Sequence, residues 1–319
     1  MLLDTSARLH FFGGKGGVGK TTLATTTAWH LAGEGRRVLL VSTDPAHNIG
    51  HLLGQPIAAH PTPVAPGLAA VELDPDATAA AHIEQVRRTM RRLTAPRLHR
   101  AVEQHLELAA TAPGTVEAAT IERLAHLAMD EDYDTVVVDT APTGHTTRLL
   151  ALPELMTAWM EGLLGHQDRS EKLSRAARSM RRADDTRLLG EDPEPRSAEL
   201  RAILTARRNL YSRFRARLTD DAAFHIVLTA ERMPVAESLD LARHLDEAGL
   251  RLADFIANRR SPRDQGEFLA QRADLEEGFL AELRRARPDV PVVEVPWLGG
   301  DMTGTAAVER LRQELLPGS

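Results

Sequence analysis

The chain has 319 residues, which suits one large or two modest domains with a substantial core. Its 39 lysines and arginines and 45 acidic residues give a formal net charge of −6, which offers no electrostatic basis for binding nucleic acid. There is no cysteine, which excludes disulfides, iron–sulfur clusters and thiolate metal sites, and no apolar run of membrane-spanning or signal-peptide type, so we expect a cytoplasmic protein without stable membrane insertion.

The first predicted elements are a strand, a glycine-rich loop and a helix. The apolar run Arg8–Phe12 predicts a short buried strand, and Lys20–Glu34 predicts a helix that ends at glycine. Between them the chain matches G-x-x-x-x-G-K-[ST], a loop whose backbone N–H groups turn onto phosphate oxygens. A glycine turn without a ligand is the alternative, but the loop, its lysine, its hydroxyl and both flanking elements agree. We therefore predict ATP binding by Gly14, Lys15, Gly16, Gly17, Val18, Gly19, Lys20, Thr21 and Thr22.

Lysine is rare in this chain, and two of its three lysines lie in this loop. Lysine is a compact charge on a flexible stem, whereas arginine is a rigid planar fork, so lysine suits a packed phosphate cradle. We expect Lys20 to reach the β- and γ-phosphates and the Thr21 hydroxyl to ligate Mg²⁺. ATP and Mg²⁺ are accordingly the expected cofactors.

Short apolar or β-branched runs recur further along the chain, separated by helical stretches. Near-continuous hydrophobicity suits strands buried on both faces, so the pattern predicts an α/β fold with a doubly wound, mainly parallel sheet. The predicted strands are Val38–Val41, Ala69–Leu73, Val136–Val138, Phe224–Leu228, Asp254–Ala257 and Val292–Val295.

Two long segments lack strand character and are helical by period, which predicts a helical subdomain inserted at two points. Two proline-rich pieces, His60–Pro66 and Gly190–Pro195, are expected to be loops. We expect the ATPase domain to comprise residues 1–75, 111–151 and 222–319, and the helical subdomain to comprise residues 76–110 and 152–221.

Two aspartates follow predicted strands. Asp44 comes shortly after Val41, and Asp139 comes directly after Val138. The carboxyl ends of parallel strands form the edge at which open α/β sheets bind ligands. An acid there suits the task of holding Mg²⁺ and its waters, and Asp44 could instead position an attacking water. We predict a metal site made by Thr21, Asp44 and Asp139.

These motifs resemble those of a known family. The glycine loop, with its extra lysine at position 15, resembles the deviant P-loop of dimeric ATPases. Ser42–Asn48 and Asp139–Leu149 resemble the two switch regions of the arsenite-pump and tail-anchored-protein-targeting ATPases. The likeness covers essentially the whole chain, since it continues through Val71–Pro75, Pro113–Ala118, Ala257–Asn258 and Val295–Leu298.

The resemblance implies a homodimer in which each subunit completes the site of the other. Lys15 would reach across a two-fold interface to phosphates bound by the partner. Asp44 would orient the hydrolytic water, and Asp139 would report on Mg²⁺ through the second switch. The remaining implied nucleotide contacts are Glu231, across the dimer, and Asn258 and Pro296, beside the adenine.

The family also suggests a role for an apolar helical stripe, which by itself is either core or a client-binding groove. We expect ATP hydrolysis to open and close an apolar subdomain that handles a hydrophobic client, such as a tail-anchored membrane protein. The first alternative is an ATPase subunit that energises a membrane transporter, although the thiolate metalloid ligands of arsenite pumps are absent. The second is a positioning ATPase of the partition or septum type. The stripe comprises Leu152, Leu155, Met156, Trp159, Met160, Leu163 and Leu164.

Overall fold

The computed structural model describes residues 5–44, 48–94, 96–112, 114–140, 161, 194–300 and 303–315. The chain divides into two compact units: a sheet unit of residues 1–75, 127–150 and 216–319, and a helical unit of residues 76–126 and 151–215. Residues 111–126, expected in the ATPase domain, fall in the helical unit, and residues 216–221, expected in the helical subdomain, fall in the sheet unit.

The sheet unit is built on one sheet, which the described residues form from eight strands in the order β3-β4-β2-β5-β1-β6-β7-β8. Neighbouring strands are parallel except for the pair of β3 with β4, so the predicted α/β fold is confirmed. The strands are β1 Leu9–Gly14, β2 Val38–Ser42, β3 Thr62–Ala65, β4 Leu68–Glu72, β5 Thr135–Asp139, β6 Ala222–Thr229, β7 Leu252–Arg260 and β8 Val292–Pro296.

For both proline-rich pieces, the prediction of a loop is wrong in part. Strand β3 lies within His60–Pro66 and pairs antiparallel at the edge of the sheet. An edge strand tolerates Pro63 because it leaves one row of backbone positions unpaired. In the second piece, Glu194 and Pro195 begin helix α7, Glu194–Asp220, where a proline is compatible with the first turn.

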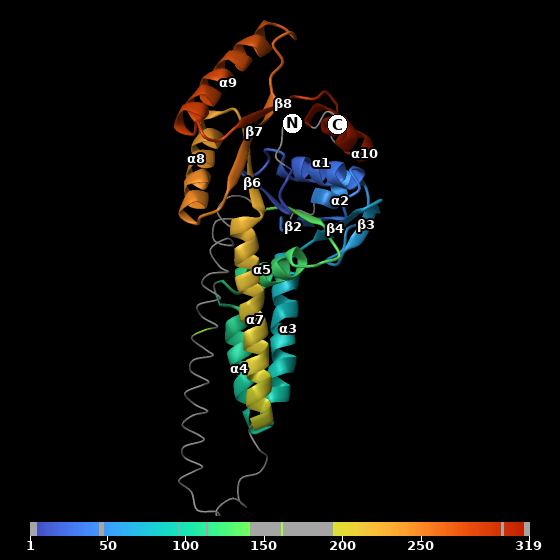
Figure 1. Ribbon diagram of the computed structural model, residues 1–319, viewed down its shortest axis with the longest axis vertical. Coiled ribbons are helices and arrows are strands. Elements are labelled where there is room, and N and C mark those ends of the chain that lie inside the picture. Colours follow the sequence, from blue (N-terminus) through green and yellow to red (C-terminus); the bar gives the residue numbers. More distant parts are fainter. Residues whose placement is uncertain are drawn as a thin grey trace, which may run out of the picture. The chain divides into compact units, whose positions relative to one another are not determined.

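Helices cover both faces of the sheet. Along β1, Phe12 packs in the core cluster with residues of α1, Lys20–Gly33, whereas the next residue, Gly13, lies against Leu241 of α8, Arg232–Glu247. Because successive residues of a strand point to opposite faces, α1 and α8 lie on opposite sides of the sheet. Figure 1 shows α1 beside α2, Asn48–Leu53, and α10, Thr305–Leu315, and it shows α8 beside α9, Glu267–Ala286.

The helical unit contains α3 Pro75–Leu93, the short η1 Pro96–Leu98, α4 His99–Ala110, and most of α5 Thr115–Ala128 and α7. The helical character predicted for residues 76–110 is therefore confirmed. Ion pairs from Arg87 and Arg91 to Glu103 join α3 to α4, and Figure 1 shows these two helices running alongside α7. The predicted apolar stripe lies outside the described residues.

A buried carboxylate ties three of these helices together. Glu122 of α5 accepts a hydrogen bond from the Tyr211 hydroxyl of α7 at 3.1 Å and pairs with Arg207 at 3.2 Å. His82 of α3 lies 3.7 Å from the same carboxylate. Burial and the Glu122 charge raise the pKa of Tyr211, which therefore stays a hydrogen-bond donor at all physiological pH values. Within the part of the chain that the structure describes, no helix has both the length and the apolarity needed to cross a membrane.

A buried chain of hydrogen-bonded polar groups joins strands β1, β6 and β7. His10 of β1 contacts the Ala7 carbonyl at 2.9 Å and the His225 ring of β6 at 3.1 Å, and His225 contacts Asp254 of β7 at 2.9 Å. Each contact requires one proton, so the chain of groups holds three protons and has no net charge. Either one ring is an imidazolium facing a carboxylate, or both rings and the carboxyl group are neutral.

We expect His225→Leu to lower the free energy of unfolding by about 2–4 kcal/mol, because it leaves Asp254 buried without its partner. Urea denaturation at neutral pH measures this loss. Replacing both groups by leucine is the control, since it removes the orphaned carboxyl and should cost less than the single change. A single variant as stable as the wild type, or a double variant that is less stable than the single one, contradicts this assignment.

Candidate functional site

The glycine loop, Lys15–Gly19, connects the end of β1 to the first turn of α1. Gly14 and Gly19 have φ values of 141° and 99°, a region that favours glycine. A Cβ at Gly14 would overlap the Val227 carbonyl of the paired strand β6, and one at Gly19 would overlap the side chain of Asn258. Glycine is therefore required at both positions by backbone conformation and by space.

Lys20 holds its charge inside this loop. Its side chain is buried, and its ammonium donates a hydrogen bond to the Lys15 carbonyl at 3.0 Å. Burial lowers the pKa of Lys20, and the negative charges of Asp139 and Asp44 oppose this effect. A cation placed at a helix N-terminus beneath a glycine loop is suited to binding phosphate oxygens.

Asp139 is the last residue of β5 and is fully buried. Its Oδ2 accepts hydrogen bonds from the hydroxyls of Thr21, at 2.7 Å, and Ser42, at 3.2 Å. Burial raises the pKa of Asp139 to about 6 against the opposing influence of the Thr21 hydrogen bond and the Lys20 charge.

The second oxygen of this carboxylate, Oδ1, has no hydrogen-bond partner among the described residues. Buried polar atoms rarely lack a partner, so this oxygen is suited to a ligand. Carboxylate and hydroxyl oxygens are the donors that Mg²⁺ prefers. Asp139 and Thr21 therefore fit the expected metal by donor chemistry.

Asp44 lies two residues beyond β2, at the same edge of the sheet. Its backbone N–H donates to the Ser42 hydroxyl at 3.2 Å, and its charge is close enough to influence Lys20. The structure thus brings Asp44, Lys20 and Asp139 together, as the sequence suggested. Residues 45–47 and 141–149 of the two predicted switch regions lie outside the described residues.

Asn258, near the end of β7, supports the glycine loop through a hydrogen bond. Its Nδ2 donates to the Val18 carbonyl at 2.7 Å, and its Oδ1 accepts the backbone N–H of Arg259 at 2.9 Å. Arg259 has φ 59°, and the pairing of β7 with β8 shifts register between Ala257 and Arg260. The Asn258 side chain therefore supports both the glycine loop and a local bulge, and its implied contact with adenine stays a prediction.

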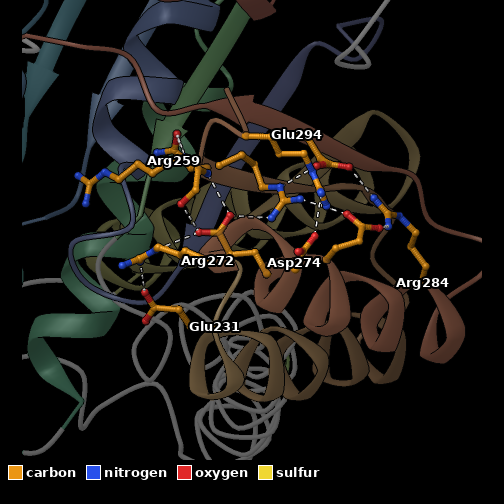
Figure 2. Close-up of polar contacts among 12 residues, drawn as sticks. Glu231, Arg259, Arg272, Asp274, Arg284 and Glu294 are labelled. Carbon is orange, nitrogen blue, oxygen red and sulfur yellow. Dashed lines mark hydrogen bonds and ion pairs between the residues drawn. The ribbon is translucent and has the colours of Figure 1, made fainter. Parts of the chain in front are cut away.

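A network of ion pairs fixes the end of β7 (Figure 2). Arg260 pairs with Glu276 at 2.7 Å, Glu277 at 3.1 Å and Glu294 at 2.7 Å, which joins β7 to α9 and β8. The Arg260 side chain is only 12% exposed and Glu276 is buried, so their ion pair is sheltered from water. The network holds the bulge that carries Asn258.

The other implied nucleotide contacts lie around this network. Glu231, the residue before α8, pairs with Arg272 of its own chain at 3.2 Å, as Figure 2 shows. Pro296 ends β8, is exposed, and pairs in register with Arg260. Their proposed contacts with nucleotide also stay predictions.

Lys15, unlike Lys20, pairs with a carboxylate of a helix. Its ammonium lies 3.0 Å from a carboxylate oxygen of Glu237 in α8. Sequence reasoning missed Glu237 because only the fold brings positions 15 and 237 together. It also missed the Ser42 hydroxyl as a partner of Asp139, although Ser42 opens the first motif that resembles a switch region.

Comparison with known proteins finds similarity over almost the whole chain. Residues 7–317 match the family described as Anion-transporting ATPase. The chain is 28% identical to the putative arsenical pump-driving ATPase 2 of Aquifex aeolicus, over 93% of the chain and 95% of that protein. It is 30% identical to an ATPase ASNA1 homolog of Trypanosoma cruzi, over 99% of the chain and 92% of that protein. An arsenical pump-driving ATPase of Acidiphilium multivorum is 30% identical over 96% of the chain, which spans 50% of that protein.

Substitution of Asn258 distinguishes a role in supporting the phosphate loop from a role in contacting the adenine base. We expect Asn258→Ala to weaken binding of both ATP and tripolyphosphate by about three- to tenfold, because the lost bond supports the phosphate loop. Titration calorimetry with Mg²⁺ present measures both affinities. Pro296→Ala is the control and should leave tripolyphosphate binding unchanged. Weaker ATP binding with normal tripolyphosphate binding would show that Asn258 acts on the base alone.

Proposed function

Because the chain belongs to the Anion-transporting ATPase family and is an ATPase, we propose that it works as a Mg²⁺-dependent homodimer that handles a hydrophobic client. ATP hydrolysis would open and close the apolar helical unit around a client such as a tail-anchored membrane protein. The observation that carries the nucleotide chemistry is the buried Lys20 inside the glycine loop, with Thr21 bonded to Asp139 at the strand edge.

Phosphoryl transfer depends mainly on positioning and charge stabilisation, and the described residues provide both. The loop amides and Lys20 would hold the β- and γ-phosphates. Thr21 and Asp139 would hold Mg²⁺, which when bound neutralises phosphate charge. Asp44 would accept a hydrogen bond from the water that attacks the γ-phosphorus, as the bond to the β–γ bridging oxygen breaks. The products are ADP and inorganic phosphate.

The homodimer is supported by the two loop lysines having different environments. Lys20 already places a cation inside the loop of its own subunit, whereas Lys15 is half-exposed and directed to α8. A second lysine that does not enter its own cradle is available to a site in another copy. Glu231 is also exposed at the surface of the sheet unit, in keeping with a contact across the dimer.

There are two alternatives to a role in handling a hydrophobic client. The names of relatives from Aquifex and Acidiphilium favour a subunit that energises a membrane transporter, but this chain has no cysteine to bind a metalloid. Arsenite or antimonite would stimulate ATP hydrolysis by such a subunit, whereas an apolar helical peptide would stimulate a client-handling ATPase. A partition or septum ATPase, the other alternative, would bind DNA or lipid vesicles.

We expect Asp44→Asn to preserve ATP affinity within about twofold and to lower turnover by about a hundredfold or more, because it removes the group that orients water. Calorimetry and single-turnover hydrolysis measure the two effects separately. Asp74→Asn is a matched control, because Asp74 also lies two residues beyond a parallel strand, β4. Lost binding with normal hydrolysis of bound ATP would make Asp44 a binding residue instead.

Mixed dimers test whether Lys15 acts on the opposite nucleotide. One subunit carries Lys15→Ala and the other carries Asp44→Asn. If Lys15 serves the partner, both lesions fall on one site, and the dimer should keep about half of wild-type activity. Activity near zero would mean that each site carries a lesion, so that Lys15 acts within its own subunit and the shared-site mechanism is wrong.

A further inference from the structure

The pairing of Lys15 with Glu237 joins the glycine loop to a helix far away in sequence. The two charged atoms lie 3.0 Å apart, and the side chains are 44% and 34% exposed. Both residues belong to the sheet unit, so the contact lies within one compact body.

The fold explains why Glu237 reaches the loop. Leu241 of α8 lies against Gly13, which immediately precedes the last residue of β1. Residues four apart share one face of a helix, so Glu237 lies on the same face one turn earlier. The side chain of Glu237 therefore extends from a helix fixed over β1 toward the residue that follows this strand.

This ion pair is well suited to being exchanged. An ion pair between partly exposed side chains contributes little to stability, because water solvates both charges in the separated state. A nucleoside triphosphate carries several negative charges, whereas Glu237 carries one. A bound triphosphate in a second copy would therefore attract the Lys15 ammonium more strongly than Glu237 does.

A similar contact holds Glu231, the other residue for which we propose a role in the partner's site. Glu231 immediately precedes α8 and pairs with Arg272 of its own chain. Both groups expected to cross the interface are thus paired within the single subunit. Glu231 immediately precedes α8, and Glu237, the partner of Lys15, lies in the amino-terminal half of that helix. Formation of the dimer would require each to exchange its partner.

We propose that Glu237 is a positioning residue that holds Lys15 within its own subunit until a second copy presents bound ATP. The proposal rests on the homodimer described above. Glu237 makes association weaker unless nucleotide is bound, because the charge of the triphosphate compensates for the small cost of breaking the ion pair. Each dimer breaks two such pairs, one in each subunit.

The test measures the dissociation constant of the dimer by sedimentation velocity, with Mg²⁺ and a non-hydrolysable ATP analogue. We expect Glu237→Gln to lower this constant about fourfold, the square of the roughly twofold effect of one exposed ion pair. Turnover at saturating protein should stay within about twofold of wild type, while half-maximal turnover is reached at lower protein concentration. Glu247→Gln is the matched control, because it makes the same charge change at an exposed position of the same helix.

The same substitution made in Lys15→Ala subunits distinguishes a positioning role of Glu237 from a structural one. In Lys15→Ala subunits, Glu237→Gln should leave the dissociation constant unchanged, whereas a structural effect would persist. The proposal is overturned if Glu237→Gln matches Glu247→Gln, weakens the dimer, or acts equally in the Lys15→Ala background. A wild-type protein that stays monomeric with the analogue would overturn the homodimer itself, and this proposal with it.

Discussion

The hydrogen bond from the Thr21 hydroxyl to the buried Asp139 carboxylate is the contact on which the rest of the site depends. It joins the first turn of α1 to the end of β5, and the Ser42 hydroxyl adds the end of β2 to the same carboxylate. Burying a carboxylate is costly unless its oxygens are compensated, and one oxygen here has no partner among the described residues. The site is therefore built around a group whose charge favours a bound cation.

Sheet topology explains how one edge collects the remaining groups. The strand order β2-β5-β1-β6-β7 places the ends of these five parallel strands side by side. Four of these strands position the site. Asp139 ends β5, Asp44 and the glycine loop follow β2 and β1, and Asn258 lies near the end of β7. At β7 the regular pairing is interrupted, and the sheltered Arg260 network holds the bulge that directs Asn258 to the loop. The buried chain from His10 to Asp254 joins three of the same strands below the site.

Much of this arrangement was predictable from sequence because its signals are local. Apolar runs located seven strands, and the glycine pattern located the loop and the helix that follows it. Strand β3 was missed because Pro63 obscured it, although an edge position accommodates proline. Glu237, Ser42 and the glutamates around Arg260 were missed because their roles depend on packing between distant segments. Likewise, residues 111–126 carry no local signal that assigns them to the helical unit.

In the proposed site, Asp139 makes ATP binding depend on a divalent cation. The most direct test of this role is the affinity for ATP, measured with and without Mg²⁺, in the wild type and in Asp139→Asn. We expect Mg²⁺ to strengthen binding about tenfold or more in the wild type and to have little effect in the variant, because an amide replaces the carboxylate ligand. An equal gain from Mg²⁺ in both proteins would contradict a metal-binding role for Asp139.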